Sequence, residues 1–480
     1  MLLAAGQSLA SCGNEEGGEK GTEPQTQTQT ETQKIEEKDY FADRLLVDDG
    51  VPTEDYHEAV FRFLTSDGDL QHLLVDEGTG EVVGDAIAER TSTVEERFNI
   101  HFEGTERNYL EVIKTLNASI MSGDDEYTLI NLTPIETCSH IRENLFLNWY
   151  DIPHIDFTKP WWYKSNIDDL TCNGVTFVAV GPLDRTVMRD TGVFFFNKSL
   201  AADYDMPDMY ELVNSGKWTA DKLISLVKDV YRDLDGDGKI NDTDLFGYAG
   251  QTDMNMNVFQ WAFGGMIARR QNDGTFVLDY YNEKAVDAYA KMRELFYQTN
   301  GSFTMDYSGH DVTGMFMNNQ VLFVAEPCGF AESLRNFEPD YGIIPYPKLN
   351  EDQKDYYTVA SGGFHTYSVP TSVKDTEFVG SVVEVLMAES WKHLAPAYYD
   401  VVLKVKGTRD ETSVAMLDYI FDHVIFDFGF FHGGWMGVGF WPQYIFQDKN
   451  GELASYYASK HKSFDKIVNK LITFYEEYDE

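Results

Sequence analysis

Acidic and amide side chains recur at fixed intervals in the segment 233–244, DLDGDGKINDTD. The spacing matches the calcium-binding loop D-x-[DN]-x-[DN]-G, which surrounds the ion with oxygens from its first, third, fifth, seventh, ninth and twelfth places. Gly238 stands at the sixth place, where such a loop turns sharply. The predicted ligands are the side chains of Asp233, Asp235, Asp237, Asn241 and Asp244 and the backbone carbonyl of Lys239. We therefore predict bound calcium here, with a solvated acidic turn as the alternative.

The elements around this loop decide whether the ion acts as a switch or as a structural support. The segment 219–232 begins with a threonine cap and carries apolar residues at helical intervals, which predicts a helix that enters the loop. The following residues, DLFGYAG, contain two glycines and do not predict an exit helix. Half of an EF-hand has no helix pair to open, so we expect calcium to stabilise the fold without switching it.

Three further segments combine aromatic rings with polar side chains: KPWWYKSN (159–166), GQTDMNMNVFQWAFGG (250–265) and FHGGWMGVGFWPQY (431–444). Rings pack on the flat C–H faces of sugars, while carboxylate and amide groups pair with sugar hydroxyls. The candidate binding residues are Trp161, Trp162, Tyr163, Asp253, Asn255, Trp261, Trp435 and Trp441. For each tryptophan, packing in the core remains the alternative.

No catalytic motif accompanies these candidates in the sequence. A nucleophile elbow, a Walker loop and the H-E-x-x-H zinc motif are all missing. A glycoside hydrolase would need only two carboxylates about 5 to 10 Å apart, and sequence spacing does not exclude such a pair among 80 acidic residues. A hydrolase therefore stays open as an alternative function.

The composition narrows the class of partner. The chain has 480 residues, more than one hydrophobic core normally holds, which predicts at least two domains. It carries 38 Lys and Arg against 80 Asp and Glu, a formal net charge of −42. This charge opposes binding to nucleic acid or to an anionic membrane surface.

The N-terminus divides into two pieces. Residues 2–10 are apolar and small, and they lead into Leu9-Ala10-Ser11-Cys12, which resembles the lipobox of bacterial lipoproteins, although no basic residue precedes Cys12. The polar and acidic tract that follows has too little apolar surface to fold. We predict a signal remnant at 1–12 with lipid on Cys12, then a flexible linker at 13–54; a disordered tail with an isolated cysteine is the alternative.

Alternating strands and helices fill the rest of the chain. Apolar runs predict strands at 59–65, 127–133, 174–180, 192–197 and 320–325, and helical periodicity predicts helices at 84–98, 284–297 and 377–389. This alternation is typical of α/β domains with largely parallel sheets.

Four segments resemble parts of a known family. They are 173–200, 213–223, 339–370 and 398–420, and they occur in the order found in bacterial extracellular solute-binding proteins, the lipoprotein receptors of carbohydrate ABC importers. The resemblance implies an α/β fold of two lobes that close on a ligand about a hinge. It implies carbohydrate binding, of an oligosaccharide in our interpretation, without catalysis, and it adds Glu326 and Phe364 as weaker site candidates.

By the same resemblance, lobe 1 comprises 55–182 and 365–423, and lobe 2 comprises 183–364 and 424–480. The implied partners are the importer's permease subunits, with the membrane contacted only through the lipid anchor. We expect a monomer at the extracellular face of the cytoplasmic membrane. A surface glycan-binding or adhesion protein without a transporter is a further alternative, since the same rings would serve it.

Overall fold

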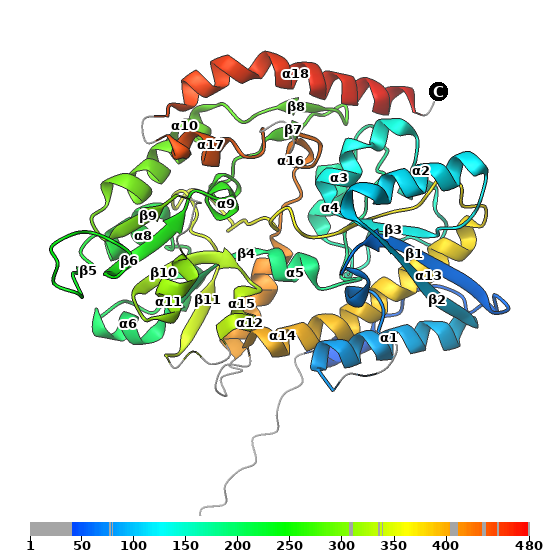
Figure 1. Cartoon of the computed structure of the whole chain (residues 1–480), viewed down its shortest axis with the longest axis horizontal. Coiled ribbons are helices and arrows are strands. Elements are labelled where there is room, and N and C mark those ends of the chain that lie inside the picture. Colours follow the sequence, from blue (N-terminus) through cyan, green and yellow to red (C-terminus); the bar gives the residue numbers. More distant parts are fainter. Residues whose placement is uncertain are drawn as a thin grey trace, which may run out of the picture.

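The computed structural model describes residues 41–75, 78, 80–306, 311–334, 337, 339–403, 411–433, 438–448 and 451–478. Cys12 and Trp435 lie outside the described residues, so the predicted lipidation site and one predicted binding ring have no structural account. Two β-sheets, each covered by helices, form the centres of two lobes that lie side by side (Figure 1). The predicted two-lobed α/β fold is thus confirmed.

The first lobe is built on a four-stranded sheet in the order β12-β3-β1-β2. Strand β1 runs parallel to both β2 and β3, while β12 is antiparallel to β3. The strands are β1 (Ala59–Ser66), β2 (Ile100–Arg107), β3 (Leu129–Leu132) and β12 (Thr366–Ser368). The helices of this part of the chain are α1 (Val82–Phe98), α2 (Val112–Ser122), α3 (Pro134–Ser139), α4 (Lys164–Leu170), α13 (Thr376–Glu389) and α14 (Ala395–Leu403).

The second lobe is built on a six-stranded mixed sheet in the order β11-β4-β10-β6-β5, with β9 also paired to β6. Its strands are β4 (Gly192–Asn197), β5 (Tyr231–Arg232), β6 (Leu245–Gln251), β9 (Ser302–Met305), β10 (Val321–Pro327) and β11 (Tyr341–Ile344), and a separate hairpin joins β7 (Ala268–Arg270) to β8 (Phe276–Leu278). The remaining helices are α5 (Thr186–Asp190), α6 (Lys198–Asp203), α7 (Met209–Asn214), α8 (Ala220–Val227), α9 (Met254–Ala262), α10 (Glu283–Arg293), α11 (Val312–Met317), α12 (Phe330–Ser333), α15 (Glu411–Asp422), α16 (Phe428–Gly433), α17 (Trp441–Gln447) and α18 (Leu453–Glu477).

Apolar patterning explains how the first sheet is covered on both faces. Phe61, Phe63 and Leu129 pack with residues of α13, which is almost entirely buried. On the other face, Leu64 packs with residues of α2, whose Val112, Ile113 and Leu116 form one buried stripe. A strand with apolar residues on both faces is expected in a parallel sheet that helices cover from two sides.

The lobes are linked by segments that run together between the sheets. Isolated bridging pairs join Ala179 to Tyr367, Thr191 to Ala360, and Thr358 to Val424. Helix α15 contacts β11, a strand of the second sheet, although the sequence interpretation places 411–422 in lobe 1. Helix α18 packs on β8 and extends toward the first lobe (Figure 1). Phe474 and Tyr475, near the end of this helix, contact Phe177 of the first lobe.

Most predicted elements are confirmed, but two are wrong. Residues 174–180 form no strand; Gly174 lies in a turn, Phe177 lies in a bend, and Val175 and Ala179 make only single bridging pairs. The helix predicted at 219–232 ends at Val227, and the chain then forms β5 beside β6. Sheet pairing has overridden the helical periodicity, because Val230 accepts a hydrogen bond from the backbone N–H of Gly247. Within the described residues, no helix has the length and apolar composition to span a membrane.

Candidate ligand-binding cleft

A cleft of about 1050 Å³ separates the first lobe from helices of the second part of the chain. Its walls include residues from the 68–75 loop, the start of α1 and the end of β2, together with Arg185, Glu332 and Val401. The loop follows the carboxyl end of β1. In open α/β sheets, ligands bind in the crevice outside the carboxyl ends of the strands, so this cleft is the candidate site.

The loop after β1 is held in place by its neighbours in the sheet. The Glu106 carboxylate, at the end of the adjacent strand β2, accepts hydrogen bonds from the backbone N–H groups of Gly68 (2.8 Å) and Leu70 (3.1 Å). The Asp69 carboxylate accepts a hydrogen bond from Ser66 Oγ (2.5 Å). The cleft wall is therefore fixed before any ligand arrives.

An ion pair lies in the cleft wall. Arg185 lies in the first chain crossing, and its Nη1 is 2.7 Å from Glu332 Oε1 on α12. The Arg185 guanidinium also lies 5.7 Å from the ring centre of Tyr398 on α14. The pair connects the first crossing to α12 of the second lobe.

A buried charge network ties the cleft loop to both crossings. His365 Nδ1 is 2.9 Å from Asp184 Oδ2, and His365 Nε2 is 3.3 Å from Asp69 Oδ2. Asp184 is fully buried, and its other oxygen accepts hydrogen bonds from the Thr186 backbone N–H (2.8 Å) and hydroxyl (2.5 Å). Both imidazole nitrogens face carboxylates, the arrangement that suits a protonated ring.

The pKa values of this network follow from its geometry. Burial alone would lower the pKa of His365, but the charges of Asp184 and Asp69 and hydrogen bonds to them raise it to about 9. Burial would raise the pKa of Asp184, but His365 and the hydrogen bonds from Thr186 hold it well below its ordinary value. Each partner thus keeps the other ionised.

Arg90 on α1 links the same regions through uncharged groups. Its guanidinium is fully buried and donates hydrogen bonds to the carbonyl oxygens of Leu73, next to the cleft loop, and Leu183, in the first crossing. A third bond reaches Ser390 Oγ (3.1 Å). Burial lowers the pKa of Arg90 to about 10, which still leaves it protonated at neutral pH.

The second lobe places three predicted site residues together. Asp253 caps α9 at the end of β6 and accepts a hydrogen bond from the Asn255 backbone N–H (2.9 Å), and Asn255 Nδ2 donates to Glu326 Oε2 (3.2 Å) near the end of β10. Burial and the charge of Asp253 raise the pKa of Glu326 to about 8. Burial raises the pKa of Asp253 to about 6. The sequence prediction named Asp253 and Asn255 in one segment and Glu326 separately, and the structure brings the three side chains together.

Two predicted rings, Trp161 and Trp162, lie in the core. They are 1% and 4% exposed, and their indole N–H groups donate to the two carboxylate oxygens of Glu384 on α13, at 3.1 and 3.0 Å. Burial raises the pKa of Glu384 to about 8, although the indole donors act in the opposite direction. Neither ring offers a free face, so this structure does not support the predicted stacking role.

The other described ring candidates are also packed inside. Trp261 is fully buried and donates to Asp427 Oδ2 (2.8 Å). Trp441 and Phe364 are each 1% exposed, and Tyr163 packs on Phe426 with ring centres 5.5 Å apart. The core alternative left open for each tryptophan therefore describes Trp261 and Trp441, and Phe364 is equally buried, whereas Tyr163 is only partly buried.

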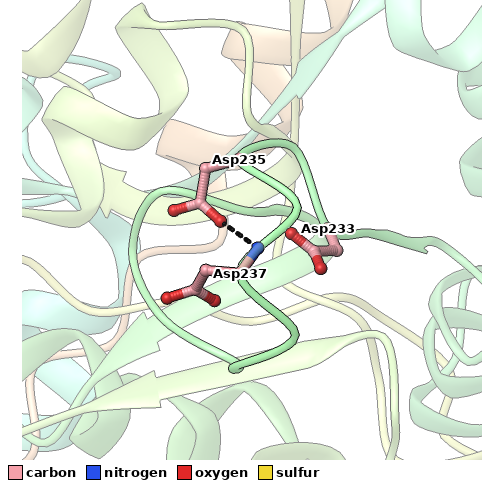
Figure 2. A group of neighbouring side chains, drawn as sticks. All are labelled: Asp233, Asp235 and Asp237. Atoms are coloured by element: carbon pink, nitrogen blue, oxygen red, sulfur yellow. Dashed lines mark hydrogen bonds between the residues drawn. The ribbon is translucent and has the colours of Figure 1, made fainter.

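The predicted calcium loop brings three of its carboxylates together. Oxygens of Asp233, Asp235 and Asp237 lie within 4.8 Å of one another, and the chain passes around them as a tight loop (Figure 2). Asp235 Oδ1 accepts a hydrogen bond from the Asp237 backbone N–H (3.0 Å). Gly236 and Gly238 have φ values of 73° and 72°, in the left-handed region that favours glycine.

The remaining predicted ligands do not all join this group. Asp244 is fully buried, and its carboxylate accepts hydrogen bonds from the backbone N–H groups of Leu234 and Asn241 and from the Tyr231 hydroxyl, each at 3.2 Å. The side chain of Asn241 accepts from Thr243. Lys239 forms an ion pair with Asp237 (3.2 Å). The donor set fits a hard cation that prefers oxygen, with three carboxylates converging from one side.

Similarity to known proteins is found among solved structures. No protein-family model and no curated protein matches the chain. Solved structures do match it. One is the sugar-binding protein MalE from Xanthomonas citri, where the match covers 87% of this chain and 100% of that protein, with a TM-score of 0.62 and 12% sequence identity. A second similar structure is the galacto-N-biose-/lacto-N-biose I-binding protein of the ABC transporter from Bifidobacterium longum, in complex with lacto-N-biose. The match covers 88% of this chain and 98% of that protein, with a TM-score of 0.56 and 10% sequence identity. The chain has a solute-binding-protein fold.

This solute-binding-protein fold is shared with proteins of different ligands. UgpB from Mycobacterium tuberculosis, in complex with glycerophosphocholine, matches 86% of the chain and 99% of its own, at a TM-score of 0.55 and 14% identity. At these identities the likeness concerns the fold, so the ligand must be argued from this chain's own cleft.

Several residues of the cleft were missed in the sequence. Asp69, His72 and Arg185 carry no recognisable motif. His365, which faces Asp69, and Glu332, which pairs with Arg185, lie far away in the chain. One signal was present: the segment SDGDLQH directly follows the apolar strand β1, and polar residues at the carboxyl end of a parallel strand are typical of ligand sites.

Proposed function

We propose that the chain is an extracellular, lipid-anchored binding protein that captures a carbohydrate for an ABC importer. The observation that carries the proposal is the cleft beside the first lobe, located at the carboxyl end of β1 and lined by both polar and apolar side chains. The fold shared with sugar-binding proteins of ABC transporters supports it. The polar tract before residue 55 and the motif ending at Cys12 suit a tether near a membrane. The permease subunits are the proposed partners of a monomeric receptor.

The first test is reversible binding without turnover. Calorimetry against a panel of oligosaccharides is expected to give saturable binding, because hydroxyl-rich ligands suit a polar cleft. Chromatography of the same oligosaccharides after long incubation is expected to show them unchanged. Steady release of shorter products would instead support the hydrolase alternative, in which Asp253 and Glu326 would be the first carboxylates to replace.

We further propose that the 233–244 loop holds calcium as a structural support. Its three grouped carboxylates repel one another when no cation is present, so the ion stabilises the folded loop. The loop is followed directly by β6, and Asp253 lies just beyond the far end of this strand, so the strand separates the ion from this predicted site residue. The flanking elements are strands β5 and β6, and no helix pair is available to open.

Removing calcium is therefore expected to lower stability and leave carbohydrate affinity nearly unchanged. Calcium at about 100 times its Kd would contribute about 2.7 kcal/mol of stability. Chelator is expected to lower the melting temperature, and Asp235→Ala is expected to abolish the response to chelator. Asp229→Ala, which removes an exposed aspartate outside the loop, is the matched control. A tenfold or larger change of carbohydrate affinity with calcium would show that the ion belongs to the binding mechanism.

A further inference from the structure

Carboxylates outnumber cations in the walls of the cleft. The described wall residues include Glu81, Glu103, Glu106 and Glu332 but only one arginine, Arg185. The histidine of the wall, His72, has its pKa lowered by burial, which favours the uncharged ring at neutral pH. The walls thus carry a clear excess of negative charge.

Three cationic side chains at the cleft and the neighbouring crossings form ion pairs with carboxylates. Arg185 is paired with Glu332 at 2.7 Å. At the neighbouring crossings, Arg189 is paired with Asp190 (2.8 Å) and His365 with Asp184 (2.9 Å). A carboxylate or phosphate on a ligand would therefore find Arg185, the arginine of the cleft wall, already paired with a carboxylate, and its desolvation would go uncompensated there.

The wall carboxylates are not neutralised to the same degree. Glu106 is held by two backbone N–H groups, which stabilise its charge without cancelling it. Glu103 pairs with Arg62 at 2.9 Å, but both side chains are well exposed, so solvent screens that pair. A positively charged group on a ligand would be attracted from several sides.

We propose that the cleft selects saccharides by charge: it prefers amine-bearing saccharides over neutral ones and excludes those that carry carboxylate, phosphate or sulfate. The inference rests on the proposed function and names the ligand class of the same site. Arg185 and Glu332 set the exclusion, because Glu332 occupies the guanidinium that an anionic ligand would otherwise use.

A glycan array that carries neutral, amine-bearing and uronate- or sulfate-bearing oligosaccharides tests the proposal. The bound set is expected to contain amine-bearing and neutral members and no anionic ones. Calorimetry then compares a glucosamine trisaccharide with its N-acetylated form at a pH at which the amines are protonated. The amine form is expected to bind at least about tenfold more tightly at low salt, and the difference is expected to shrink as salt rises.

The outcomes separate this inference from the proposed function. Anionic oligosaccharides among the tightest binders would overturn the charge selection and leave carbohydrate capture intact. Equal affinity for amine and N-acetyl forms at low salt would overturn the preference for amines. The lack of binding to any saccharide would overturn the proposed function together with this inference.

A single substitution tests the role of the ion pair. Glu332→Gln leaves Arg185 without its carboxylate, so a trigalacturonate probe is expected to gain at least about tenfold in affinity over the wild type. Glu96→Gln makes the same change in net charge on an exposed part of α1 and is expected to leave trigalacturonate binding as weak as in the wild type. Equal behaviour of the two variants would overturn the role assigned to Glu332.

Discussion

Replacing Asp184 with asparagine is expected to lower the free energy of unfolding by about 3 to 5 kcal/mol, because it breaks a buried charge pair and leaves His365 without its main partner. Asp184 is fully buried and accepts hydrogen bonds from Asn131, Thr186 and His365. Denaturant unfolding followed by tryptophan fluorescence measures the loss.

A double-mutant cycle with His365→Gln isolates the pair itself. The sum of the losses in unfolding free energy of the two single variants is expected to exceed the loss of the double variant. The difference, which is the coupling energy of the pair, is expected to be about 1 to 3 kcal/mol. Asp221→Asn is the matched control, since it breaks the exposed pair with Lys291, and should cost no more than about 1 kcal/mol. If Asp184→Asn costs no more than this control, the network does not stabilise the crossings.

The sign of the pH dependence follows from the direction of each pKa shift. The folded-state pKa of His365, about 9, lies above its ordinary 6.5, so its contribution is complete below about pH 6.5 and is lost as pH rises through about 9. The pKa of Asp184 is depressed below its ordinary 3.8, so its contribution is present above that value and is lost as pH falls. The cycle should therefore show its largest coupling between these limits.

Glu384→Gln is expected to destabilise the protein at acidic pH and to stabilise it at alkaline pH. The pKa of Glu384 is raised from 4.5 to about 8, so the folded state keeps a proton that the unfolded state loses. Wild-type stability relative to the variant should therefore fall as pH rises from about 4.5 to about 8, by on the order of 4 kcal/mol in total. Glutamine cannot ionise, but it accepts from only one of the two indoles and should cost about 1 kcal/mol at low pH.

Unfolding curves of both proteins between about pH 5 and about pH 9 measure this crossover. The wild type is expected to be the more stable protein at the acidic end and the variant at the alkaline end. Glu96→Gln again serves as control, and its difference from the wild type should not change with pH across this window. A constant difference between Glu384→Gln and the wild type would show that Glu384 is already ionised in the fold.

Local patterns in the sequence predicted the elements that depend on local information. Strand β1 and helix α13 were found because apolar residues fill them, and burial of both in the first lobe explains that composition. The helix at 219–232 was overestimated, since nothing in its own sequence shows that Val230 lies against β6. Which strands pair in a sheet depends on the tertiary structure, so the periodicity of one segment does not predict it.

The site was harder to predict than the fold for the same reason. Asp253, Asn255 and Glu326 were named as candidates in two separate segments, and each ends or follows an apolar strand, where the fold gathers polar residues. Trp161 and Trp162 were misjudged because their environment depends on Glu384, more than 220 positions along the chain. A tryptophan beside polar residues in sequence is equally common in a satisfied core.

The discontinuous first sheet has a consequence for biosynthesis. Strand β12 completes that sheet, and its Thr366 hydroxyl donates to the carbonyl of Leu132, 234 residues earlier in the chain. At ribosomal rates of about 5 to 20 residues per second, β12 is synthesised on the order of 10 to 50 seconds after β3. Helix α13, which covers Phe61 and Phe63, arrives later still. The first half of the nascent chain must therefore be kept from aggregating by something other than its own fold until almost four fifths of the protein has been made.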